Sequence, residues 1–124
     1  MIGAIIGDII GSRFEWHNIK TKEFELFHRR CHPTDDSVMT LAVAQAILDS
    51  KGDLDALSQN TVRHMQALGR RYPHAGYGGN FRRWLRAENP QPYNSYGNGS
   101  AMLFPLCARK MAAAVASAPF IPSG

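Results

Sequence analysis

The chain has 124 residues and a formal net charge of +4 at pH 7, and 44% of its residues are hydrophobic and 19% charged. This composition excludes an intrinsically disordered chain, and the length predicts a single domain over residues 1–124. The longest apolar stretches fall short of the roughly 20 residues that a membrane-spanning helix needs. No basic segment precedes the first of them, as it would in a secretory signal peptide. We therefore expect a cytoplasmic protein without a membrane partner.

The first dozen residues have the pattern of a buried helix. Their isoleucines follow the spacing of one helical face: Ile2, Ile5, Ile6, Ile9 and Ile10. Glycines at positions 3, 7 and 11 lie beside that face, where they predict the close approach of another backbone. The hydrophobic residues of segment 16–33 follow neither a helical nor a strand period, which predicts a long connecting loop.

Two longer helices are expected next. The hydroxyl of Thr34 can cap a helix that runs to Gly52, and Asp53 can cap another that ends by Tyr72, before Pro73. The short connection between them predicts a helical hairpin.

The remaining pattern is also helical. A short helix is expected over residues 80–87, with Phe81, Trp84 and Leu85 directed inward. A loop rich in Pro, Asn and Gly follows over residues 89–99, and an Ala-rich helix over 100–118. No segment shows the alternation of hydrophobic and polar residues that is typical of a strand, so the predicted fold class is all-α.

The segment Thr34-Asp35-Asp36-Ser37 presents two adjacent carboxylates at a helix start. Carboxylate and hydroxyl oxygens are the ligands that Mg²⁺ prefers. The same residue types are favoured at helix N-termini, where they accept hydrogen bonds from free N–H groups and complement the helix dipole. The spacing alone leaves both interpretations open.

Two other segments could contribute to a site. Glu15 follows the first helix and could fold back toward a metal or a substrate. The loop over residues 94–100 contains two glycines and precedes a helix start, which would suit an anion site, although the pattern by itself is that of an ordinary turn.

Six arginines and no acidic residue lie between positions 63 and 86, and aromatic residues are interspersed among them. This composition is found on nucleic-acid-binding surfaces. The spacing of Phe81, Trp84 and Leu85 instead favours a core face, with the arginines solvated. Nucleic acid is therefore not the expected partner.

In their order along the chain, these segments resemble the amino-terminal half of the ADP-ribosylglycohydrolase family, the all-α enzymes related to dinitrogenase reductase-activating glycohydrolase. The matching segments are residues 3–12, Glu15, residues 34–39, residues 77–78 and residues 95–102. The resemblance extends from residue 1 to about residue 105, and residues 106–124 form an atypical tail. It implies an orthogonal helical bundle of the ADP-ribosylglycohydrolase type.

The resemblance further implies hydrolysis of the glycosidic bond that joins ADP-ribose to a protein side chain or a small acceptor, at a centre of two Mg²⁺ or Mn²⁺ ions. It implies Thr34, Asp35 and Asp36 as metal ligands, and Glu15, Asp35 and Asp36 as catalytic residues. The substrate-binding residues that it implies are Tyr96, Gly97, Asn98, Gly99, Ser100 and Met102.

Two departures from the family pattern bear on activity. Family members are longer and supply further metal ligands from a later Asp-x-Asp-[Ser/Thr] segment, whereas this chain has no acidic residue after Glu88. Leu103 also stands where an arginine is common. We therefore expect a truncated family member, with an exposed apolar surface that favours a homo-oligomer.

Two functional hypotheses follow from these departures. In the first, the chain is a hydrolase whose remaining metal ligands come from water, substrate or a second subunit. In the second, it is a catalytically inactive member that serves at most as an ADP-ribose-binding or interaction module.

Overall fold

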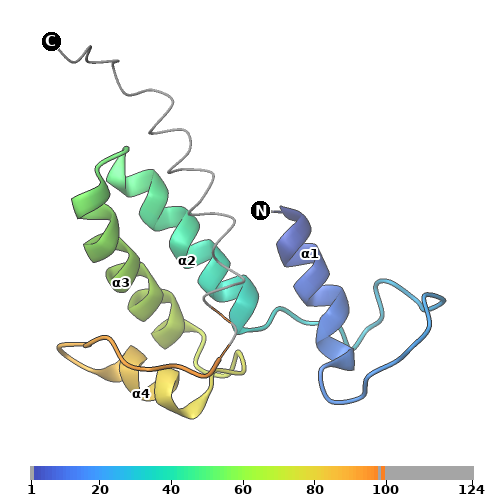
Figure 1. Ribbon diagram of the computed structural model, residues 1–124. Coiled ribbons are helices and arrows are strands. Elements are labelled where there is room, and N and C mark those ends of the chain that lie inside the picture. The colour runs from blue at the N-terminus through green and yellow to red at the C-terminus, as the bar shows by residue number, and fades with distance from the viewer. Residues whose placement is uncertain (1, 98, 100–124) are drawn as a thin grey trace, which may run out of the picture.

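The computed structural model describes residues 2–97 and 99 (Figure 1). Within this part of the chain the structure has four α-helices and no strand, which confirms the predicted all-α class. The helices are α1 (Ile2–Gly11), α2 (Asp35–Ser50), α3 (Leu54–Arg71) and α4 (Gly79–Arg86), and a 3-10 turn, η1 (Ser12–Phe14), follows α1. No helix among the described residues is long and apolar enough to cross a membrane. The predicted helix over residues 100–118 lies outside them.

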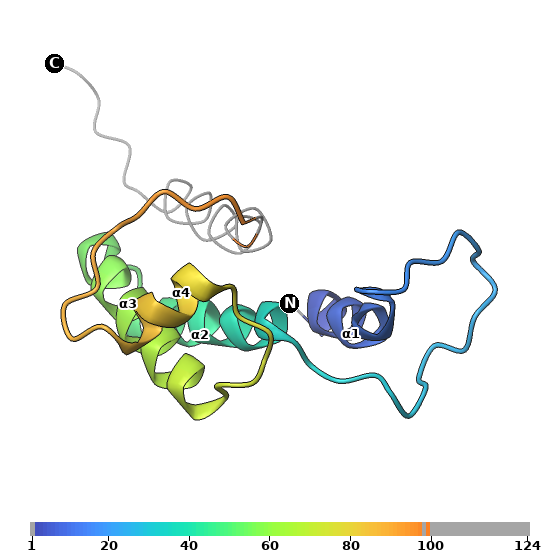
Figure 2. The same ribbon diagram turned by 90° about the horizontal axis from the view of Figure 1, so that it is seen from below.

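Helices α2 and α3 form the predicted hairpin and lie side by side along most of their length (Figures 1 and 2). Both predicted caps are confirmed. Thr34 Oγ1 accepts a hydrogen bond from the Asp36 N–H at 3.3 Å, and Asp53 Oδ1 accepts from the N–H groups of Asp55 and Ala56. The local sequence therefore defines where both helices begin.

The turn between the two helices differs slightly from the prediction. Helix α2 ends at Ser50, and Lys51 is its C-cap in the left-handed region, with φ of 48°. Gly52 follows with φ of 98°, a conformation that glycine adopts without steric strain. The predicted stop at Gly52 thus falls one residue after the actual cap.

The buried core lies at the end of the hairpin nearest α4, which crosses that end (Figure 1). Leu85 is 2% exposed, and Phe81 and Trp84 pack against the same cluster, so the predicted inward face of α4 is confirmed. The other members of the core and its partly buried neighbours are Val38, Met39, Tyr77, Met65, Leu68 and Ala75.

Side chains of α3 hold α4 in place by binding its last carbonyl groups. Gln66 donates to the carbonyls of Trp84 and Ala87, and Arg70 Nε donates to the carbonyl of Leu85 at 2.7 Å. The last carbonyls of a helix lack their usual intrahelical partners, although that of Trp84 also accepts from the Ala87 N–H, and a cation near them is favourable. The side chains of α3 thereby fix the position of the end of α4.

The predicted burial of the first helix is wrong for the described part of the chain. Helix α1 has no buried residue, and Ile2 and Ile6 are 75% and 40% exposed. Among the described helices it packs only against α2, beside the hairpin, and the loop over residues 16–33 extends away from both (Figure 2). One neighbour is too few to cover the whole isoleucine face.

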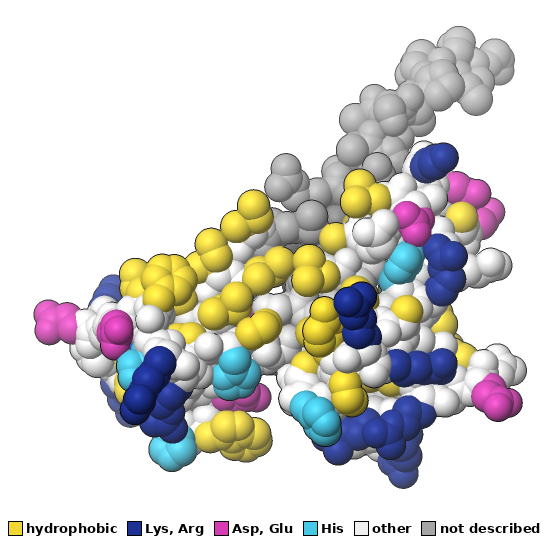
Figure 3. Space-filling model, turned by 180° about the vertical axis from the view of Figure 1, so that it is seen from behind, with side chains coloured by type: hydrophobic (Ala, Val, Ile, Leu, Met, Phe, Trp, Pro, Cys, Tyr) yellow, Lys and Arg dark blue, Asp and Glu magenta, His cyan; other side chains and the backbone are white. Residues whose placement is uncertain are grey.

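The glycines of α1 also lack the close backbone neighbour that their spacing predicts. A Cβ atom placed on Gly3, Gly7 or Gly11 would have nothing within 4 Å. Hydrophobic side chains remain uncovered on this side of the molecule, where they form a continuous group in the space-filling view (Figure 3).

Asp49 joins α2 to α3 through exposed polar contacts. Its Oδ2 lies 2.7 Å from His64 Nε2 and 3.1 Å from Arg63 Nη2, and Gln45 donates to its Oδ1. Hydrogen bonds from Gln45 and His64, with the charges of His64 and Arg63, lower the pKa of this carboxyl below its ordinary value of 3.8.

Replacing Asp49 by asparagine is expected to lower the melting temperature near neutral pH by only about 1–3 °C, because the group is exposed and screened. A lowered pKa stabilises the folded state fully above the unfolded-state value of 3.8, and this stabilisation is lost as the pH falls through the lowered pKa. The difference between the two proteins should therefore vanish in acid. Thermal melts across that pH range measure it, and a difference that persists in acid would contradict the assignment.

Candidate functional site

The start of α2 is held by a carboxylate from α1. Asp8 Oδ2 accepts from the Thr34 N–H at 2.9 Å and the Ser37 N–H at 3.2 Å, and also from the Ser37 hydroxyl. Asp8 Oδ1 accepts from the Thr34 hydroxyl at 2.5 Å. A negative charge at a helix N-terminus is favourable, so Asp8 acts as a second cap supplied from 26 residues away.

Sequence analysis did not assign Asp8 to the site. The available signal was a carboxylate within an otherwise apolar helix, because a partly buried charge needs hydrogen-bond partners. Those partners are the residues that flank the acid pair. Thr34 is the N-cap of α2, and Asp8 accepts from the N–H groups of Thr34 and Ser37, so capping of this helix does not depend on the acid pair alone.

Asp35 and Asp36 are half-buried, and burial is the main reason that the pKa of each carboxyl lies above its ordinary value. The charges of Glu15 and Asp8 raise the pKa of Asp35 further, although backbone hydrogen bonds partly oppose this effect. The charges of Asp35 and Asp8 act in the same way on Asp36. Crowded carboxylates of this kind favour a nearby cation, which would relieve their mutual repulsion.

The loop between α3 and α4 brings Tyr77 and Gly76 to the acid pair. A Cβ atom on Gly76 would lie 3.5 Å from Asp35 Oδ1, and the φ of Gly76 is 103°, which favours glycine. Tyr77 is 2% exposed, and its hydroxyl oxygen is buried without a hydrogen-bond partner among the described residues. Burial and then the charge of Asp35 raise the pKa of Tyr77 to about 12. A buried phenol that stays protonated is a hydrogen-bond donor available beside Asp35.

The remaining predicted site residues are Glu15 and the substrate-binding residues, and the structure describes only some of them. Glu15 is exposed at the end of η1, and its charge acts on Asp35, so the structure brings it toward the acid pair. Tyr96 is fully exposed, and the Gly97 N–H donates to Ser95 Oγ within the same loop. Three of the predicted substrate-binding residues lie outside the described part of the chain: Asn98, Ser100 and Met102.

The donor set at α2 fits part of a divalent metal site. Asp35 and Asp36 supply two carboxylates whose repulsion a cation would relieve, and Thr34 supplies a hydroxyl that is already bound to Asp8. Within residues 2–97 and 99, no three His, Cys, Asp or Glu side chains converge closely enough to hold a metal ion. The described residues thus provide some but not all of the ligands that such a site requires.

These features define the protein as an all-α domain with a cluster of carboxylates at the junction of α1, α2 and the loop before α4. A family model for ADP-ribosylglycohydrolase matches residues 1–120, and the chain therefore belongs to this family. The match confirms the resemblance and extends beyond residue 105 into most of the tail. No curated protein and no solved structure matches the chain.

Proposed function

We propose that this chain hydrolyses the glycosidic bond between ADP-ribose and a protein side chain or small acceptor, with a binuclear Mg²⁺ or Mn²⁺ centre at the start of α2. The observation that carries the proposal is the crowding of Asp35 and Asp36, whose pKa values are both raised by burial and by neighbouring acids. The family match over residues 1–120 supports the same assignment. Water, substrate or a second copy of the chain would fill the remaining ligand positions.

The residues of the proposed site have distinct tasks. Thr34, Asp35 and Asp36 would hold the metal, and Asp8 keeps their segment of backbone in position. When bound, such ions supply positive charge that orients ribose hydroxyls and stabilises charge developing at the scissile bond. The unpartnered hydroxyl of Tyr77 would donate a hydrogen bond to a group beside Asp35, and Glu15 would border the same space.

Substrate contacts are proposed for the loop that follows residue 94. Tyr96, Gly97 and Gly99, with the neighbouring Asn98, Ser100 and Met102, would bind the diphosphate and ribose of the substrate. Small residues there let the backbone N–H groups approach an anion closely.

The test is release of ADP-ribose from an ADP-ribosylated protein by the purified chain, with Mg²⁺ or Mn²⁺ and with chelator. We expect metal-dependent release that falls at least about a hundredfold in Asp35→Asn and Asp36→Asn, because each change removes a charged ligand. Binding of Mn²⁺ alone, followed by electron paramagnetic resonance, should weaken in the same variants.

Asp55→Asn is the matched control. Asp55 is the second residue of α3 and donates its N–H to the cap Asp53, as Asp36 is the second residue of α2 and donates to the cap Thr34. It should retain full release. Release that is unaffected by chelator, or equal in Asp36→Asn and Asp55→Asn, would refute the proposal. Absence of release together with binding of ADP-ribose would favour the inactive binding module.

A further inference from the structure

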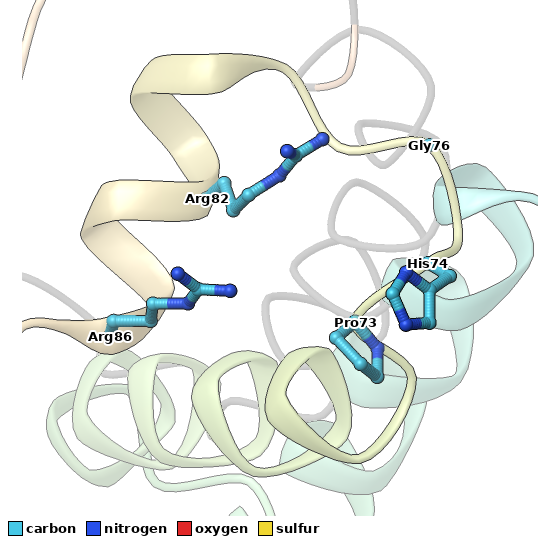
Figure 4. Close-up of a pocket in the computed structure, with 5 residues that line it drawn as sticks. All are labelled: Pro73, His74, Gly76, Arg82 and Arg86. Atoms are coloured by element: carbon cyan, nitrogen blue, oxygen red, sulfur yellow. The ribbon is translucent and has the colours of Figure 1, made fainter.

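A second set of charged residues lies around the loop before α4, whose Gly76 also adjoins Asp35. Pro73, His74, Gly76, Arg82 and Arg86 line a pocket of about 230 Å³ between α4 and the loop before it (Figure 4). The pocket is smaller than the roughly 300–1,000 Å³ of sites for drug-sized ligands, so it suits a small ion or a single chemical group. No acidic residue lines it.

Both arginines extend from α4 toward the loop that carries His74 and Gly76 (Figure 4). They are four residues apart and therefore neighbours on one face of the helix, where like charges repel. Within residues 2–97 and 99, neither arginine forms an ion pair, and Arg86 forms no side-chain hydrogen bond. Arg82 donates one hydrogen bond, to the carbonyl of Tyr77 at 3.1 Å, which orients its guanidinium.

The α3–α4 side of the pocket is also basic. Lysine and arginine side chains gather over the α3–α4 side of the molecule (Figure 3), and no acidic residue occurs between Arg63 and Arg86. A cleft lined by charges of one sign raises the local concentration of the opposite ion. Guanidinium groups match the geometry of phosphate oxygens because each can donate two parallel hydrogen bonds.

We propose that this pocket binds an oxyanion of the phosphate class, held by Arg82 and Arg86 with His74 at its edge. None of the carboxylates at the start of α2 lines this pocket, although Gly76 adjoins Asp35, and the proposal does not depend on the hydrolase activity. The bound group could be a free phosphate ion or a phosphate of ADP-ribose, and the experiment below separates these two sources.

Binding of inorganic phosphate to the full chain is measured by isothermal titration calorimetry in a buffer without other multivalent anions. We expect saturable binding that weakens at least about tenfold in the Arg82→Gln/Arg86→Gln double variant, because two charged hydrogen-bond donors are lost. Arg86→Gln alone should also weaken binding. This single variant keeps the test independent of the Arg82 contact with Tyr77.

Arg83→Gln is the matched control, because Arg83 lies on the same helix, donates to Asn80 and does not line the pocket. It removes the same charge and should leave phosphate binding within about twofold. Absence of saturable binding by the unmodified chain, or equal losses in Arg83→Gln and Arg86→Gln, would overturn the proposal. A competing titration with ADP-ribose identifies the source: displacement of phosphate assigns the pocket to the nucleotide, and simultaneous binding assigns it to free phosphate.

Discussion

Replacing Asp8 by alanine is expected to lower the free energy of unfolding by about 3 kcal/mol, a large fraction of the stability of a small domain. The variant leaves two backbone N–H groups at the start of α2 and two hydroxyls without their common acceptor. These groups are partly buried, so water replaces the lost hydrogen bonds incompletely. Urea unfolding followed by circular dichroism measures the change.

Asp8→Asn keeps the shape of the side chain and removes its charge and one acceptor oxygen, so it tests whether the carboxylate itself is needed. An amide has one acceptor oxygen and would direct its own N–H groups at donors of Thr34 or Ser37, so we expect a loss of about 2 kcal/mol. Asp55→Ala, which removes an exposed acid from the first turn of α3, should change stability by no more than about 0.5 kcal/mol. A loss of stability below about 0.5 kcal/mol in Asp8→Ala would contradict the proposed capping role.

Leu85→Ala is the second change with a large expected effect, about 3 kcal/mol of destabilisation. Leu85 is 2% exposed in the core between α3 and α4, and its truncation leaves a cavity there.

Gly69 on α3 faces this side chain directly. A Cβ atom on Gly69 would lie 2.5 Å from Leu85 Cδ2 and 2.7 Å from Cδ1, so Gly69→Ala forces Leu85 to shift, and we expect a loss of about 1–2 kcal/mol.

The two changes are expected to compensate partly when combined. In Gly69→Ala/Leu85→Ala the new methyl group enters the space that Leu85 vacates, so the double variant should be more stable than the sum of the single effects by about 1 kcal/mol or more. Chemical unfolding of the four proteins completes this double-mutant cycle. Gly7→Ala, where the added methyl group meets nothing within 4 Å, should not destabilise the protein. Strict additivity would show that Leu85 does not occupy the space beside Gly69.

Most of the secondary structure could be predicted because it depends on interactions within a few residues. Thr34 and Asp53 cap helices through N–H groups two or three positions away, and the spacing of Phe81, Trp84 and Leu85 reports one face of a short helix. The acid pair was also visible in the sequence, since adjacent carboxylates at a helix start are a local pattern.

The sequence by itself therefore determined the all-α class, the starts of the two long helices and the position of the Asp35–Asp36 pair. Only the tertiary structure decided that Asp8 caps α2, that Tyr77 and Gly76 adjoin Asp35, and that α1 keeps an exposed isoleucine face. It also placed Arg82 and Arg86 opposite His74 in one pocket. The physical reason is that each of these features joins groups distant in the chain or depends on how many neighbours a helix face finds, and periodicity within a segment carries no information about either.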